Sequence, residues 1–247
     1  MTVVLLHALA VSGQMWAEPH RMLERAGHRV LAPDQRGYGA TPLGSAAPSL
    51  DVVADDLAEV LDTQGLREVT LVGCSMGGYV AMAFLRRHPA RVRALALLAT
   101  RADADDEAAA ARRETFAEVI LDPQRRPAVL EQTIPTLVGE TTRTARPDVL
   151  ARLTELVQIT DPAAIAWSQR AIATRQDSLA ILREVQVPSV VIAGEEDGLV
   201  TVAEHQRVVD ALPDSKLITV RRSGHLTPME APDEVAAAID ELVSRSG

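Results

Sequence analysis

The sequence predicts an α/β fold in which helices wrap a mainly parallel sheet and an all-helical insertion interrupts the pattern. Two observations support this prediction. Short apolar runs alternate with helical periods along the first hundred residues, and again near the C-terminus. Between these two stretches, from about residue 103 to residue 182, only helical periods occur. We therefore expect a core domain made of residues 1–100 and 186–247, and a helical lid at residues 101–185.

The first part of the core alternates regularly between strands and helices. Its expected elements are strand 2–6, helix 15–26, strand 29–32, helix 50–63, strand 69–72, helix 76–87 and strand 92–98. Gly27 and Gly65 follow two of the helices, and Pro33 ends a strand. Short connections between such elements are typical of a parallel sheet covered by helices.

The insertion and the end of the chain complete the pattern. The expected lid helices cover residues 107–120, 128–137, 147–158, 162–174 and 178–185. The core then resumes with strand 189–193, helix 202–211, strand 216–220 and helix 232–244. A helical segment inserted between two strands of a parallel sheet is a candidate lid over the ends of those strands.

Composition and charge narrow the classes of function. The net charge of −9, with scattered basic residues, argues against a nucleic-acid partner and against an anionic membrane surface. Cys74 is the single cysteine, which excludes a disulfide framework. The N-terminus shows no signal-peptide pattern, and no apolar run has the length of a membrane span. We expect a cytoplasmic protein, either a monomer or a homodimer.

A nucleophile motif lies between the strand at 69–72 and the helix at 76–87. It reads Gly73-Cys74-Ser75-Met76-Gly77-Gly78, the G-x-S-x-G pattern in a strand–turn–helix context. Side chains at Gly73 and Gly77 are expected to clash across so sharp a turn, and Gly78 is expected to let the helix approach a neighbouring strand. The turn would raise the Ser75 hydroxyl above the C-terminal edge of the sheet.

A base and an acid follow in the chain order that this motif favours, which is Ser, Asp or Glu, then His. His225 lies after Gly224 in the loop between the last strand and the last helix, and Glu230 is expected to fix that loop. Asp197 follows the next-to-last strand and is the expected orienting acid, while Glu195 and Glu196 can point to solvent. Asp103, after the earlier strand 92–98, is the alternative acid.

Acyl transfer also requires donors for the developing oxyanion. The backbone N–H of Met76, at the start of a helix, is one expected donor. The N–H of Leu9, in the loop after the first strand, is the other. We expect His7 to brace that loop rather than to act as an acid or a base.

Together these motifs resemble those of the α/β-hydrolase superfamily over nearly the whole chain. The matching segments are Leu-Leu-His at 5–7, Pro-Asp-Gln-Arg-Gly-Tyr-Gly at 33–39, Gly-Cys-Ser-Met-Gly-Gly at 73–78, Gly-Glu-Glu-Asp at 194–197 and Gly-His at 224–225. The chain departs from the family pattern at Ala8 and Ala10, where Gly and Pro are usual. It also lacks the usual N-terminal hairpin, so the resemblance implies about six strands rather than eight.

The resemblance is greatest to small esterases, enol-lactonases and cofactor-free haloperoxidase-like enzymes. It implies a serine hydrolase that cleaves a small-molecule carboxylic ester or lactone through an acyl-enzyme on Ser75. We expect no cofactor and no metal, because the sequence contains neither a metal-ligand cluster nor a phosphate-binding loop. Four apolar lid residues are expected either to line the pocket or to pack the lid itself: Trp167, Ile134, Leu137 and Ile172.

Two other classes keep the same triad. The first is a C–C bond hydrolase or a lyase of the hydroxynitrile type. A lyase of that type would be expected to carry a lysine reaching the substrate, and Lys216 is the only lysine. The second is a ligand-binding protein with vestigial hydrolase activity, which very slow turnover and tight ligand retention would identify.

Overall fold

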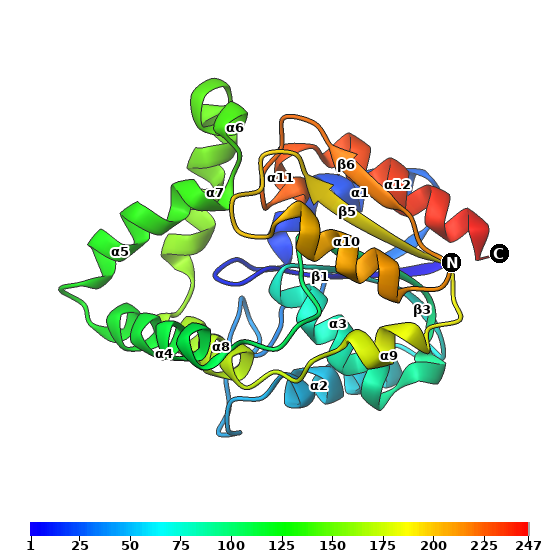
Figure 1. The fold of residues 1–247 in the computed structure, drawn as a ribbon, viewed down its shortest axis with the longest axis horizontal. Coiled ribbons are helices and arrows are strands. Elements are labelled where there is room, and N and C mark those ends of the chain that lie inside the picture. The colour runs from blue at the N-terminus through cyan, green and yellow to red at the C-terminus, as the bar shows by residue number, and fades with distance from the viewer. Residues whose placement is uncertain (247) are drawn as a thin grey trace.

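The computed structural model describes residues 1–246 and confirms the predicted fold class (Figure 1). Six strands form one sheet in the order β2-β1-β3-β4-β5-β6, and every neighbouring pair is parallel. The strands are β1 (Thr2–Leu6), β2 (Arg29–Leu31), β3 (Val69–Cys74), β4 (Val92–Leu98), β5 (Ser189–Gly194) and β6 (Leu217–Val220). The number of strands matches the expectation of about six, and β1 begins at Thr2.

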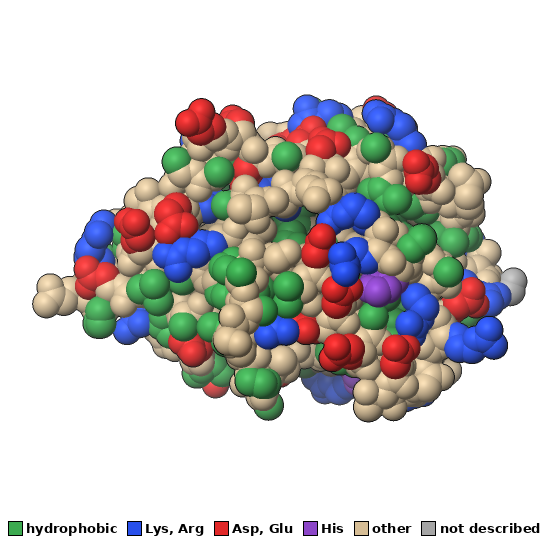
Figure 2. Space-filling model, turned by 90° about the horizontal axis from the view of Figure 1, so that it is seen from below, with side chains coloured by type: hydrophobic (Ala, Val, Ile, Leu, Met, Phe, Trp, Pro, Cys, Tyr) green, Lys and Arg blue, Asp and Glu red, His purple; other side chains and the backbone are tan. Residues whose placement is uncertain are grey.

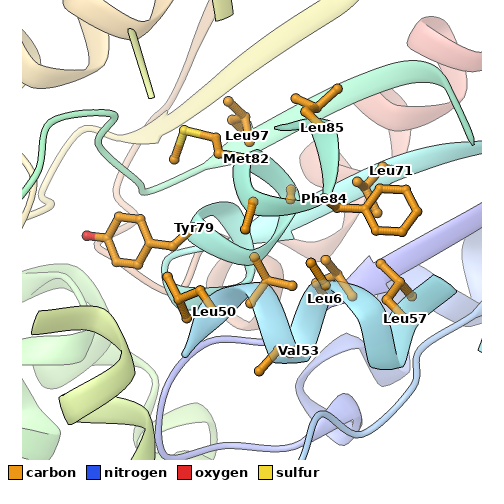
Figure 3. Packing of buried hydrophobic residues seen from close by; sticks show 14 of the residues in the cluster. Leu6, Leu50, Val53, Leu57, Leu71, Tyr79, Met82, Phe84, Leu85 and Leu97 are labelled. Carbon is orange, nitrogen blue, oxygen red and sulfur yellow. The ribbon is translucent and has the colours of Figure 1, made fainter. Parts of the chain in front are cut away.

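Helices cover both faces of this sheet. α1 (Ala17–Arg25) and α12 (Pro232–Arg245) pack together on one face. The opposite face carries α2 (Leu50–Thr63), α3 (Met76–Arg87), α9 (Leu179–Arg183) and α10 (Val202–Ala211). Each face buries its own apolar cluster, as expected when period-2 strands present alternate side chains to two helical layers. Figure 3 shows the cluster between β3, α2 and α3, where Leu57, Leu71 and Phe84 interdigitate.

The predicted helical insertion occupies the chain between β4 and β5, and no strand interrupts it among the described residues. It contains α4 (Glu107–Leu121), α5 (Arg126–Thr133), α6 (Glu140–Ala145), α7 (Pro147–Ile159) and α8 (Pro162–Ala173), followed by α9. In Figure 1, α4 to α8 lie together beyond the end of the sheet opposite both termini, whereas α9 lies along α3 and α10.

Some boundaries differ from the prediction for local reasons. The helix expected at 128–137 ends at Thr133, and a 3₁₀ turn, Ile134–Leu137, follows it because Pro135 lacks an N–H for the α-helical hydrogen bond. The helix expected at 15–26 likewise opens with a 3₁₀ turn, Gly13–Trp16. α6 and the single-turn α11 (Thr227–Glu230) were not predicted.

The strand register determines where a site can form. Leu6 of β1 lies beside Gly73 of β3, Cys74 beside Leu98 of β4, and Gly194 of β5 beside Val220 of β6. Because all six strands run the same way, the loops that follow these residues gather at one edge of the sheet. Ser75, Asp197 and His225 all belong to those loops.

The surface and the helix lengths carry two further findings. No helix within residues 1–246 is both long and apolar enough to cross a bilayer. On the face seen in Figure 2, Lys and Arg side chains are interspersed with Asp and Glu side chains rather than gathered into one patch.

Candidate active site

Ser75 occupies the sharp turn between β3 and α3. Its backbone has φ 53° and ψ −112°, a left-handed conformation that L-residues rarely adopt. The turn is held from both sides, because the Ser75 N–H donates to the Leu98 carbonyl at 2.8 Å and the Ser75 carbonyl accepts from Thr100 Oγ1 at 3.0 Å. The neighbouring strand β4 and the residues just after it therefore stabilise the strained residue.

The three glycines of the motif allow close approach, as the sequence predicts. A Cβ on Gly73 would lie 2.3 Å from the Gly77 carbonyl oxygen, across the turn itself. One on Gly77 would lie 2.2 Å from the Leu6 carbonyl oxygen of β1, and one on Gly78 would lie 2.6 Å from Thr100 Cγ2. The start of α3 thus packs against β1 and the end of β4 at distances that exclude any side chain.

A continuous hydrogen-bond chain joins the three residues that the sequence singled out. His225 Nε2 lies 2.8 Å from Ser75 Oγ, and His225 Nδ1 lies 3.0 Å from Asp197 Oδ2. Because Asp197 accepts at Nδ1, the hydrogen of a neutral imidazole is on Nδ1, and Nε2 is free to accept the proton of Ser75. The alternative acid, Asp103, binds Arg207 through Oδ2 at 2.9 Å.

The environment of Asp197 keeps it ionised. Its side chain is 1% exposed, and this burial by itself raises the carboxyl pKa. Opposing that effect are the hydrogen bond and charge of His225 and the backbone N–H groups of Leu199 and Val200, which donate to Oδ1 at 2.8 and 3.1 Å. Together they lower the pKa of Asp197 below its ordinary value. A charged acid thus lies behind the imidazole.

Glu230 fixes the His225 loop, as expected, and it also reaches the insertion. Its buried carboxylate accepts from Gly224 N at 3.0 Å, beside His225, and from Gly139 N at 2.8 Å and Thr142 Oγ1 at 2.6 Å. The start of α6 is therefore tied to the residue that precedes the histidine.

The sequence analysis allowed Glu196 to point to solvent, but in the structure its carboxylate binds the insertion. It accepts from the N–H of Thr141 at 2.7 Å and from its hydroxyl at 2.6 Å. These hydrogen bonds lower the pKa of Glu196. Glu196, next to Asp197, and Glu230, in the segment that follows His225, thus both hold the same short helix of the insertion, α6.

The loop after β1 is held by His7, whose side chain is buried. His7 Nδ1 donates to the Ala8 carbonyl at 2.9 Å, and Nε2 accepts from Gln35 N at 2.9 Å. Gln35 Nε2 in turn donates to the His7 carbonyl at 2.8 Å. Burial lowers the pKa of His7 to about 4, against the opposing effect of the hydrogen bond to Ala8. The ring is therefore a neutral brace in this loop.

This burial predicts a dependence of stability on pH. The folded-state pKa of His7 lies below its ordinary value of 6.5, so the unfolded chain binds the extra proton first. The contribution of the neutral His7 ring to the free energy of unfolding is fully present above pH 6.5 and is lost as the pH falls toward 4. The loss amounts to about 2 kcal/mol at pH 5. Urea unfolding at pH 7 and at pH 5 measures this loss. Between these two pH values, the free energy of unfolding should fall less in His7→Gln than in the wild type. An equal loss in both proteins would contradict this role for His7.

The two expected oxyanion donors are the N–H groups of Leu9, in the loop after β1, and of Met76, at the start of α3. Ala8 N donates to Met15 Sδ at 3.2 Å, but neither Leu9 N nor Met76 N donates to any group within residues 1–246. Ala10 has φ 64°, and its carbonyl accepts from Thr160 Oγ1 of the insertion at 3.0 Å. This left-handed residue turns the chain just after Leu9, so the loop bends at the position where the family pattern has Pro.

Ser75 and His225 line a cavity of about 250 Å³ between the core and the insertion. Ile134, Leu137 and Ile172 line it, together with Leu9 of the loop after β1. Trp167 does not, which corrects the expectation that it might. Its indole Nε1 donates to the Ala46 carbonyl at 2.9 Å, and its ring packs with the cluster on the α2 face of the sheet.

The cavity lining includes residues that the sequence analysis missed, among them Tyr79, Arg113 and Gln169. Tyr79 lies one helical turn after Ser75, and Figure 3 shows its ring projecting out of the packed cluster. That i, i+4 spacing was a usable signal. Arg113 of α4 and Gln169 of α8 also line the cavity. No comparable signal identified Arg113, since α4 has almost no segregation of apolar from polar residues and Arg112 beside it is exposed.

Comparisons with known proteins agree with this geometry. Pimeloyl-(acyl-carrier protein) methyl ester esterase of Aromatoleum aromaticum is 30% identical, over 98% of this chain and 97% of that protein. The 2-hydroxy-6-oxononadienedioate/2-hydroxy-6-oxononatrienedioate hydrolase 1 of Dechloromonas aromatica is 27% identical, over 94% and 83%. The solved structure of a thermophilic esterase from Thermogutta terrifontis superposes with a TM-score of 0.95 at 31% identity, covering 100% of this chain and 90% of that one. Residues 2–232 match the alpha/beta hydrolase fold family, and the chain belongs to it.

Proposed function

We propose that this protein is a serine hydrolase that cleaves a carboxylic ester or a lactone of a small molecule. The observation that carries the proposal is the unbroken chain Ser75–His225–Asp197, whose serine and histidine line a cavity between the core and the insertion. Esterases among the relatives of similar length, at 30% and 31% identity, support the same class of reaction.

The proposed reaction has two acyl-transfer steps. His225 Nε2 takes the proton of Ser75 as the serine oxygen attacks the substrate carbonyl, and Asp197 stabilises the imidazolium that forms. The backbone N–H groups of Leu9 and Met76 donate to the tetrahedral oxyanion. His225 then protonates the leaving alcohol, and later removes a proton from the water that hydrolyses the acyl-enzyme.

We further propose that the helical insertion, residues 101–185, acts as the lid of the core formed by residues 1–100 and 186–247. Ile134 and Leu137, from the 3₁₀ turn after α5, and Ile172, from α8, all line the same cavity as Ser75. They would shape the acyl or alcohol pocket and exclude water from it. The hydrogen bonds of Glu196 and Glu230 to α6 support this role, because they fix the insertion relative to the acid and base loops.

The test is labelling with a fluorophosphonate, which reacts with an activated serine. Mass spectrometry should locate the label on Ser75, since within residues 1–246 it is the only serine hydrogen-bonded to a histidine. His225→Ala should lose the rapid labelling while its circular dichroism stays that of the wild type, because the base is removed without disturbing the sheet. A folded wild-type protein that remains unlabelled would overturn the proposal and favour the ligand-binding alternative.

The lyase alternative gains no support from the structure. Lys216 precedes β6, and its Nζ donates to Glu241 at 2.5 Å rather than lining the cavity. The C–C hydrolase alternative shares the triad with the ester hydrolase. It is supported by the similarity to the 2-hydroxy-6-oxononadienedioate/2-hydroxy-6-oxononatrienedioate hydrolase 1 of Dechloromonas aromatica. Assay of the wild-type protein on an ester and on a vinylogous 1,5-diketone acid would separate the two reactions.

A further inference from the structure

A buried charge cluster borders the cavity on the side of the insertion. Arg113 Nε and Arg175 Nη1 bind the two different oxygens of the Asp105 carboxylate, the second at 2.6 Å. The side chains of Asp105 and Arg175 are 3% and 4% exposed. Two guanidinium groups thus share one carboxylate, and the cluster has one positive charge in excess.

No neighbouring carboxylate balances that charge. Asp103 lies close to Arg175, but its own carboxylate binds Arg207 at 2.9 Å. Arg101, the other arginine that lines the cavity, is paired with Glu204 at 3.0 Å. Within residues 1–246, no Asp or Glu side chain lines the cavity. On this side of the cavity, a substrate therefore meets the Arg113 guanidinium, whose Asp105 partner is shared with Arg175.

The cluster also offers unused hydrogen-bond donors. Arg113 Nε is bound to Asp105 and its Nη1 donates to Gln169 Oε1 at 3.0 Å, but its Nη2 donates to no group within residues 1–246. Because Gln169 accepts through Oε1, its amide NH₂ faces away from that bond, and it too donates to no described group. Both side chains line the cavity. Two donors of this kind, one of them charged, suit a carboxylate.

We propose that Arg113 and Gln169 form a subsite for a carboxylate on the substrate, so that the preferred substrate is an ester or lactone that also carries a free acid. One excess positive charge matches a monoanion better than a dianion such as a phosphate ester. This inference rests on the proposed ester hydrolysis and goes one step beyond it, because it names the chemical class of substrate. Ser75 acts on one carbonyl while Arg113 holds the distant acid.

The experiment compares two matched series of substrates. One contains the monomethyl esters of straight-chain dicarboxylic acids from succinate to pimelate, and the other contains the methyl esters of the corresponding half-amides. The amides have the same shape and no charge. For the chain length that spans the cavity, kcat/KM of the acid should exceed that of the amide about 10- to 100-fold, the range for a hydrogen bond to a charged group. The excess should shrink as salt is added.

Arg113→Gln tests which residue supplies the charge. It should remove the preference for the acid, so that kcat/KM becomes equal for the acids and the half-amides, while Arg113→Lys should retain part of the preference. Asp105 keeps Arg175 as its partner in both variants, so the buried carboxylate is not left alone. Arg112→Gln is the matched control, because it removes the same charge from an exposed position on the same helix. It should keep the wild-type preference.

The outcomes separate this inference from the proposed function. Equal rates of wild-type protein on acids and amides would overturn the carboxylate subsite and leave the esterase intact. An acid preference that survives in Arg113→Gln would overturn the assignment to Arg113. If that variant does not fold, competitive inhibition of the wild type by the free dicarboxylate but not by the diamide still decides the question. No hydrolysis of either series, together with no fluorophosphonate labelling of Ser75, would instead refute the proposed function.

Discussion

Replacing Ser75 with Ala or with Gly should abolish ester hydrolysis in both variants. The two variants should nevertheless differ in their free energy of unfolding. Loss of the nucleophile costs about a million-fold in kcat in serine hydrolases with this triad logic. Both variants also lose the hydrogen bond to His225 Nε2 equally. They differ in backbone freedom, because φ 53° and ψ −112° are strained for Ala and accessible to Gly.

We expect Ser75→Gly to be more stable than Ser75→Ala by about 1 kcal/mol. Strain of this kind costs about 1–3 kcal/mol, and the greater entropy of unfolded Gly offsets about 0.5–1 kcal/mol of the relief. Chemical denaturation measures the difference in the free energy of unfolding. Ala111→Gly, at an exposed position inside α4, is the control and should destabilise the protein by about 1 kcal/mol. A Ser75→Gly variant less stable than Ser75→Ala would show that the turn is unstrained.

The sheet and the chain of three residues could be predicted because their signals are local and repeated. Each strand is a short apolar run, and Ser75 lies in a motif whose glycines have a steric reason. α6 had no such signal. Its sequence, Glu-Thr-Thr-Arg-Thr-Ala, has no apolar face to bury, and it is held instead by Glu196 and Glu230 from distant loops. Helices of this kind depend on tertiary contacts that no local pattern records.

The direction of the side chains in the helical insertion was beyond sequence reasoning for a related reason. Almost every side chain of α8 between Ala164 and Ile172 is buried, so apolar periodicity does not show which face meets the cavity. In the structure, Ile165, Gln169 and Ile172 share the cavity face at helical spacing, and Trp167 lies on the opposite side. A helix buried on both faces needs the neighbouring elements to assign its roles.

Asp197→Asn is expected to lower kcat/KM on a chromogenic ester about ten-thousand-fold while leaving the fold intact. The reason lies in how the new amide would be oriented. Leu199 N and Val200 N both donate to Asp197 Oδ1 in the structure, so an asparagine would place its oxygen there. Its NH₂ group would then face His225 Nδ1. A donor at that position selects the tautomer with hydrogen on Nε2, which cannot accept the proton of Ser75.

One control for this variant tests the loss of a negative charge near His225, and the other tests which aspartate is the orienting acid. Glu195→Gln removes the same charge from the same turn, but its carboxylate accepts from Arg222 N and does not contact His225, so its activity should stay close to wild type. Asp103→Asn tests the alternative acid and should lose little activity, because Asp103 binds Arg207 instead. A larger loss in Asp103→Asn than in Asp197→Asn would transfer the role of the acid to Asp103. If Asp197→Asn retained full activity, the tautomer argument would fail, since the imidazole would then hold its productive form without a carboxylate behind it.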